Sequence, residues 1–238
     1  MLKGKTALIT GATGGLGQAI ARELAKHGCN LLLTGRDPAK LQLLSREIAI
    51  EAHFSSTLKI EAQAVDLSID KDIGSLLSQA KAMGVNILVN SAGSFPLKNI
   101  LESSNEDFDK CFAVNVRAPF ILSREIAADM RAGGWGRIVN IGSSSSYNGS
   151  ADTGVYCASK HALLGLTRSL YKELRKSNVR AYSVSPGSIK TPMGATDIRQ
   201  DYTTFLNPEE IAEYISFIIS YDKEMISEEI RMNRMVVR

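Results

Sequence analysis

Short apolar runs alternate with longer amphipathic segments along almost the whole chain. Strands that are buried on both faces show such continuous apolar runs, whereas half-exposed strands alternate apolar with polar residues. The runs predict strands at residues 5–10, 30–34, 58–64, 87–90, 137–141, 179–185 and, as a last short strand, 229–232. The pattern therefore predicts a parallel sheet.

The segments between these runs have the length and periodicity of helices. They predict helices at residues 16–26, 38–51, 71–83, 105–131 with an interruption near Pro119, 153–176, and 208 to about 220. The last helix has a clear N-terminal signal. It consists of an N-cap residue, a proline at the first helical position and a glutamate at the third, namely Asn207, Pro208 and Glu210. We infer an α/β fold in a single domain over residues 1–238, a Rossmann-type doubly wound parallel sheet with helices on both faces.

Composition excludes several classes of protein. The 238 residues carry a net charge of +3, with 44% hydrophobic and 22% charged residues, as in an ordinary globular protein. No basic block is present, so we do not expect nucleic acid as a partner. The apolar runs are too short to span a bilayer, and the first residues lead directly into a strand without a signal peptide. We therefore expect no membrane association and a cytoplasmic location.

The metal-binding residue types are scattered. The cysteines and histidines are Cys29, Cys111, Cys157, His27, His53 and His161. They show no paired ligand spacing, so we expect free thiols and no metal site.

A glycine-rich turn, Thr10-Gly11-Ala12-Thr13-Gly14-Gly15-Leu16-Gly17, joins the first predicted strand to the first predicted helix. Glycines let the backbone turn tightly and approach a pyrophosphate, which the free N–H groups of the helix N-terminus then bind. The spacing differs from the common G-x-G-x-x-G fingerprint. The turn still predicts nucleotide binding, because further strand–helix units follow it.

This turn resembles the T-G-x-x-x-G-x-G pattern of the short-chain dehydrogenase/reductase family, through Thr10, Gly11, Gly15 and Gly17. Through Gly14 it also fits T-G-x-x-G-x-x-G, the pattern of the larger extended relatives. The compact length and the later run Pro186-Gly187-Ser188-Ile189-Lys190-Thr191, which resembles P-G-x-I-x-T, favour the short branch.

The end of the second strand predicts which nicotinamide cofactor binds. An acidic residue there binds the adenosine ribose and selects NAD, whereas a nearby arginine accommodates a 2′-phosphate. The discriminating position resembles Gly35, which has no carboxylate, and Arg36 follows it. We therefore predict NADP(H) over NAD(H), although Asp37 offers an alternative acidic residue.

The resemblance extends the cofactor site along the chain. Asn90-Ser91-Ala92-Gly93 is similar to the family's N-N-A-G, with Ser91 in place of an asparagine. The resemblance implies cofactor contacts from Gly11, Thr13, Gly15, Leu16, Gly17, Arg36, Asp66, Leu67, Asn90, Ala92, Gly93, Tyr156, Lys160, Pro186, Gly187, Ile189 and Thr191.

Tyr156 and Lys160 are four residues apart in a predicted helix, so their side chains share a face. An ammonium beside a phenol lowers the phenol's pKa and makes it usable for proton transfer. The family resemblance adds Ser143 and Asn115, although Ser144 directly follows Ser143 and could take its place.

The resemblance also implies the roles of these four residues. Tyr156 gives a proton to the carbonyl oxygen that receives a hydride, and Ser143 orients that oxygen. Lys160 lowers the pKa of Tyr156 and holds the nicotinamide ribose, and Asn115 holds a water for proton resupply.

The expected substrate is a small carbonyl compound or alcohol, with a resemblance to 3-oxoacyl-thioester reductases. Residues expected to line its pocket are Phe95, Leu97, Ser145, Tyr147, Asn148 and Met193. The family's common glycine-rich ending is absent after Ile226, so a homodimer is favoured over a homotetramer. A non-enzymatic NADP-binding redox sensor on the same fold is the alternative.

Overall fold

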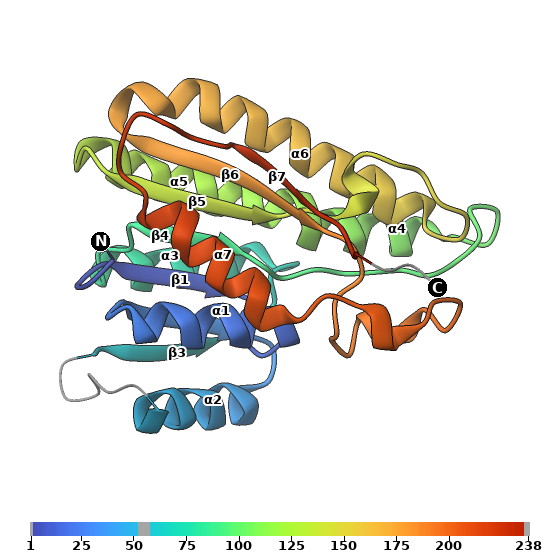
Figure 1. Ribbon diagram of the computed structural model, residues 1–238, viewed down its shortest axis with the longest axis horizontal. Helices are drawn as coiled ribbons and strands as arrows, with labels where there is room; N and C mark the ends of the chain where they lie inside the picture. Colours follow the sequence, from blue (N-terminus) through green and yellow to red (C-terminus); the bar gives the residue numbers. More distant parts are fainter. Residues whose placement is uncertain (1, 52–57, 236–238) are drawn as a thin grey trace.

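The computed structural model describes residues 2–51 and 58–235. Seven strands of this part form one parallel sheet in the order β3-β2-β1-β4-β5-β6-β7. The strands are β1 (Thr6–Thr10), β2 (Asn30–Gly35), β3 (Ile60–Ala64), β4 (Ile87–Asn90), β5 (Gly136–Ile141), β6 (Val179–Pro186) and β7 (Glu229–Met232). Their order reverses between β1 and β4, as in a doubly wound sheet (Figure 1). The predicted fold class is confirmed.

The principal helices are α1 (Gly15–Lys26), α2 (Pro38–Glu51), α3 (Asp70–Ala82), α4 (Asn105–Phe112), α5 (Ala118–Ala132), α6 (Gly154–Leu174) and α7 (Pro208–Ser220). The predicted helix over residues 105–131 is divided by a π-helical turn at Ala113–Arg117. Pro119 follows this turn and has no N–H to donate to the Asn115 carbonyl. The predicted interruption is therefore real, and it lies just ahead of the proline.

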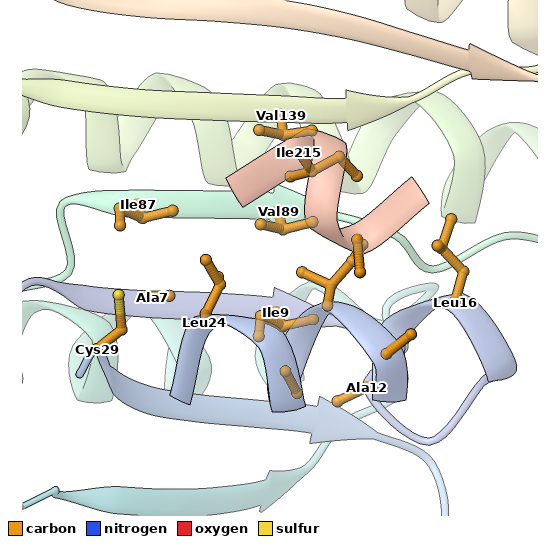
Figure 2. Close-up of a cluster of buried hydrophobic side chains, with 14 of the residues drawn as sticks. Ala7, Ile9, Ala12, Leu16, Leu24, Cys29, Ile87, Val89, Val139 and Ile215 are labelled. Atoms are coloured by element: carbon orange, nitrogen blue, oxygen red, sulfur yellow. The ribbon is translucent and has the colours of Figure 1, made fainter. Parts of the chain in front are cut away.

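Alternate residues of the strands face two different helix layers. Ala7 and Ile9 of β1 point toward α1, α2 and α7, and Figure 2 shows them packed with Leu24 and Ile215. Leu8, between them in the sequence, points to the opposite face, where α3, α5 and α6 contribute the partners. Burial on both faces explains why inner strands such as β1 and β4 are mostly apolar, whereas the partly exposed edge strand β3 carries polar residues.

One buried charge interrupts this apolar interior. Arg137 of β5 is 0% exposed, although it is followed by the apolar residues Ile138 and Val139 in a fully buried strand. Its guanidinium donates to the carbonyls of Ile219 (3.0 Å) and Asn178 (3.1 Å) and pairs with Asp222 at 2.6 Å. The arginine therefore ties β5 to the segment that follows α7.

In the described part of the chain, no helix has the length and apolar character needed to cross a membrane. Within the same residues no three His, Cys, Asp or Glu side chains gather as metal ligands, and His53 lies outside them. Cys29, Cys111 and Cys157 are free, as expected from the sequence, and the structure shows that all three are buried.

The β1–α1 turn is built from backbone in close contact. Gly11 has a φ of 63°, and a Cβ there would lie 2.7 Å from the Cα of Ala92. A Cβ on Gly17 would overlap the Gly11 carbonyl oxygen. Glycine is therefore required at both positions.

A pair of glycine substitutions tests this requirement. Gly17→Ala should lower the free energy of unfolding by about 1–3 kcal/mol, because the Gly11 carbonyl has to move. Gly74→Ala in α3 is the control, because a Cβ there meets nothing within 4 Å. The control should raise stability by about 0.5–1 kcal/mol through helix propensity. Urea denaturation of both variants measures the difference, and a neutral Gly17→Ala would contradict the close packing.

Candidate active site

A cavity of about 1110 Å³ lies along the carboxyl ends of the strands, where doubly wound sheets bind their ligands. The predicted residues that line it are Gly11, Thr13, Gly15, Leu16, Gly17, Arg36, Asp66, Leu67, Ala92, Gly93, Ser143, Tyr156, Lys160, Pro186, Gly187, Ile189 and Thr191. The fold thus brings together segments that are separated by up to 180 positions (residue 191 minus residue 11).

Tyr156 lies in the first turn of α6, and its ring meets Phe95 edge to face with 4.7 Å between centroids. Burial raises the pKa of Tyr156 to about 12, and a hydrogen bond with Ser143 acts in the opposite direction. Ser144 and Ser145 also line the cavity, but the hydroxyl that interacts with Tyr156 is that of Ser143. This geometry favours Ser143 over its neighbour.

Lys160 is buried one turn further along α6. Its Nζ donates to the carbonyl of Ile141 at 2.7 Å and lies 5.6 Å from the centroid of the Tyr156 ring. Burial lowers the pKa of Lys160 to about 8.

These positions correct one prediction from the sequence. We expected the Lys160 ammonium to lower the pKa of Tyr156, but that pKa is raised. The physical reason is desolvation, which disfavours the charged form of both groups and outweighs the other influences. The helical spacing brings the two residues to one site, but burial decides how each of them titrates.

Asn115 lies beneath the cavity rather than in its lining, and is 1% exposed. Its amide donates to the Ser94 carbonyl (2.9 Å) and to the Ser159 hydroxyl (2.9 Å), and its oxygen accepts the Ser94 N–H (2.8 Å). Ser159 in turn donates to the Tyr156 carbonyl at 2.7 Å. Asn115 thus connects the loop after β4 with the helix that carries Tyr156.

Asn90, a predicted cofactor residue, also lies outside the lining. It is 2% exposed, and its amide donates to Asn140 at 2.7 Å. Asn140 donates to Thr167 at 2.8 Å. The Asn90 side chain therefore belongs to a buried network that joins β4, β5 and α6.

Of the residues predicted to line the substrate pocket, some line the cavity and others do not. Phe95, Ser145 and Met193 line the cavity, whereas Leu97, Tyr147 and Asn148 do not. Tyr147 donates instead to Glu229 at 3.1 Å.

The end of β2 carries the predicted determinants of cofactor choice. Arg36 and Lys40 line the cavity. The Asp37 carboxylate does not, since it accepts the N–H groups of Ala39 (3.0 Å) and Lys40 (3.1 Å) at the start of α2. Of the charged side chains at the β2–α2 junction, those of Arg36 and Lys40 therefore face the cavity.

The turn after β6 packs directly on the glycine-rich turn. A Cβ on Gly15 would lie 2.7 Å from the Thr191 methyl carbon. The Gly187 N–H donates to the Met232 carbonyl at 2.8 Å, which fixes this turn against the end of β7. The sequence suggested Gly15 for its freedom to turn, and the structure adds that it makes room for Thr191.

Several lining residues were not predicted from the sequence. They are Gly14, Thr34, Gly35, Lys40, Val65, Ser68, Ser91, Ser94, Lys110, Val114, Ile141, Gly142, Ser144, Ser150, Thr153, Ser188, Pro192, Gly194, Asp197, Arg199, Gln200, Asn233 and Arg234. Some, such as Gly14 and Gly35, belong to segments that the sequence analysis singled out and could have been included. Asn233 and Arg234 follow β7 and belong to no motif, so no local signal indicates them.

Comparisons with known proteins agree with this geometry. The short chain dehydrogenase family model matches residues 5–202. A 3-oxoacyl-[acyl-carrier-protein] reductase FabG of Rickettsia bellii (strain RML369-C) is 34% identical over 237 residues, which covers 95% of this chain and 93% of the relative.

Solved structures give the same result. A metagenomic short-chain oxidoreductase in complex with NADP is 32% identical with a TM-score of 0.84, covering 98% of this chain and 99% of that one. The 3-ketoacyl-(acyl-carrier-protein) reductase of Brucella melitensis, complexed with NADH, is 27% identical with a TM-score of 0.87, covering 98% and 97%. The chain therefore belongs to the short-chain dehydrogenase family of oxidoreductases.

Proposed function

We propose that this protein transfers a hydride between NADP(H) and the carbonyl or secondary alcohol group of a small molecule, with Tyr156 as the general acid and base. One observation carries the proposal. A single cavity extends from the glycine-rich turn and Arg36 to the interacting pair Ser143 and Tyr156. We further propose that the site belongs to one domain over residues 1–238, because a single sheet contains the described strands.

The lining fits a phosphorylated dinucleotide. The turn at Gly11 and Gly17 leaves no room for side chains, so backbone N–H groups can approach a pyrophosphate. At the β2 end, Arg36 and Lys40 offer cations suited to a 2′-phosphate. Several solved relatives carry NADP or NADPH and one carries NADH, and the cations at this strand end likewise favour NADP(H).

When bound, NADPH supplies the hydride. Tyr156 then donates its phenolic proton to the oxygen of the reacting carbonyl, and its raised pKa keeps that proton in place at neutral pH. Ser143 donates a hydrogen bond toward the same oxygen. Lys160 uses one N–H group on Ile141, and its other two can stabilise the phenolate left on Tyr156 and bind ribose hydroxyls.

Asn115 supports this arrangement from below. Its side chain holds Ser94 and Ser159, and Pro119 leaves its backbone carbonyl without the usual helical donor. That carbonyl is suited to accept a hydrogen bond from the water through which Lys160 would be resupplied with protons.

The catalytic role is tested by Tyr156→Phe, which should reduce NADPH-dependent ketone reduction by about 10³-fold or more while NADPH binding stays within about threefold. Tyr147→Phe is the matched control, because it removes a hydroxyl outside the cavity. Steady-state turnover and NADPH fluorescence give the two readouts. Normal turnover by Tyr156→Phe would refute the assignment, and NADPH binding without turnover in the native protein would favour a redox sensor.

The phosphate role is tested by Arg36→Ala, which should weaken NADPH binding about 10- to 100-fold and NADH binding far less, since charged hydrogen bonds of about 1.5–3 kcal/mol are lost only with NADPH. Arg46→Ala, an exposed arginine of α2 that does not line the cavity, is the control. Fluorescence titration with both cofactors gives the dissociation constants. Equal weakening for both would show that Arg36 does not bind the phosphate.

The titration of Lys160 predicts a pH dependence. Its pKa is lowered to about 8, so the ammonium is present below that pH and is lost above it. The kcat/KM for NADPH, which reports the free enzyme, should therefore fall about tenfold per pH unit as the pH rises past about 8. Tyr156 does not titrate in this range. A flat profile between pH 6 and 10 would show that the charge on Lys160 is not needed.

A further inference from the structure

The basic residues that line the cavity fall into separate groups along the sheet edge. They are Arg36, Lys40, Lys110, Lys160, Arg199 and Arg234. Arg36 and Lys40 follow β2, whereas Arg234 follows β7, five strand positions away in the sheet. At about 4.8 Å per strand, this is a separation of roughly 24 Å. Arg234 therefore lies at the opposite end of the cavity from the proposed 2′-phosphate site.

Arg199 directly precedes Gln200, which accepts a hydrogen bond from Arg234, but the charge of Arg199 is already balanced. Its Nε and Nη2 donate to both oxygens of Asp197, at 2.7 and 3.0 Å. Its Nη1 donates to Asp152 at 3.0 Å, across the cavity mouth. Arg199 thus connects two loops, and its charge is balanced by two carboxylates.

Arg234 is held in place by neutral groups. Its Nη1 donates to the Thr204 hydroxyl at 3.1 Å, and its Nη2 donates to the Gln200 side-chain oxygen at 2.9 Å. The guanidinium lies 5.2 Å from the ring centroid of Phe205. Gln200 is fixed in turn by the Ser188 hydroxyl at 2.8 Å. The side chain is therefore pre-positioned by the loop that follows β6.

Among the residues that the structure describes, Arg234 has no ion-pair partner of opposite charge. Among residues 2–51 and 58–235, the ion pairs at this end of the cavity involve Arg199 and leave Arg234 without a carboxylate. Arg234 is half-buried, and two of the five guanidinium N–H groups are used. A fixed, partly desolvated arginine with free donors is suited to bind a planar anion through two hydrogen bonds.

We propose that Arg234 binds a carboxylate of the substrate, so that the protein acts on oxo acids and the corresponding hydroxy acids. The proposal rests on the proposed function, because it assumes that the reacting carbonyl meets Tyr156. Strands β5 and β7, which lead to Ser143 and Arg234, are two positions apart, or roughly 10 Å. Arg234 lines the cavity with a long side chain, so the gap that remains to Ser143 matches the length of a small oxo acid.

The charge requirement is tested with acid and ester pairs. The substrates are 3-oxobutanoate and 5-oxohexanoate, each with its methyl ester, which has the same carbonyl but no charge. Arg234→Leu should raise KM for the preferred acid about 10- to 100-fold more than for its ester, with kcat for the acid changed little. Arg234→Lys should retain part of the acid preference, because it keeps the charge and loses the planar fork.

Arg231→Leu is the matched control. Arg231 lies in β7, does not line the cavity, and stacks 3.4 Å from the Tyr147 ring centroid. This variant removes the same charge three residues away and should leave the ratio of acid to ester KM unchanged. An equal effect of Arg234→Leu on acid and ester, or no preference for either acid over its ester in the native protein, would overturn the proposal.

A binding measurement separates this proposal from the proposed function. Saturation-transfer NMR with 3-hydroxybutanoate and 5-hydroxyhexanoate, and with their methyl esters, needs no turnover. Binding of an acid by the native protein that is lost in Arg234→Leu would support the carboxylate site even if no ketone were reduced. Reduction of the esters without Arg234-dependent binding of either acid would keep the proposed function and refute the carboxylate site.

Discussion

The site depends on the close packing of three turns at the carboxyl edge of the sheet. The glycine-rich turn meets the loop after β4 where Gly11 approaches Ala92, and it meets the turn after β6 where Gly15 faces Thr191. At both approaches a Cβ on the glycine would lie too close to its neighbour, so both positions require glycine, and the glycine-rich turn presents backbone groups to the cavity. The ends of β1, β4 and β6 are thereby held at fixed separations, and the cavity can extend across several strands.

Burial governs the chemistry at the centre of this cavity. It raises the pKa of Tyr156 and lowers that of Lys160, so both groups are shifted toward their neutral forms. The same low-polarity surroundings strengthen the hydrogen bonds of Ser143 and Ile141 to these two residues. A phenol that keeps its proton at neutral pH is suited to protonate a carbonyl oxygen, and the ammonium limits the cost of the phenolate that remains.

The charges at the two ends of the cavity differ in what surrounds them. At the β2 end the one acidic candidate, Asp37, is occupied by the first turn of α2. At the β7 end Arg199 is paired with two carboxylates, whereas Arg234 has neutral partners. Hydrogen-bond pairing, rather than the number of basic residues, therefore decides which cations are available to ligands.

The sequence alone determined the elements and the local motifs. Continuous apolar runs predicted the buried parallel strands, and the glycine-rich turn and the Tyr156–Lys160 spacing were visible because their residues are neighbours in the chain. Element ends shifted by a few residues, and the helix predicted over residues 105–131 contains a π-helical turn. These features follow from periodicity and backbone geometry, which are properties of short segments.

Only the tertiary structure decided which polar side chains are buried, which of them form hydrogen bonds with each other, and which residues line the β7 end of the cavity. The fold places the Asn90 side chain in a buried hydrogen-bond network and buries the guanidinium of Arg137. It also raises the pKa of Tyr156, which the spacing to Lys160 alone suggested would fall. It also brought Arg234, which belongs to no motif, to the cavity beside Gln200. Desolvation and long-range contact depend on what the folded chain places around a group, and no local pattern contains that information.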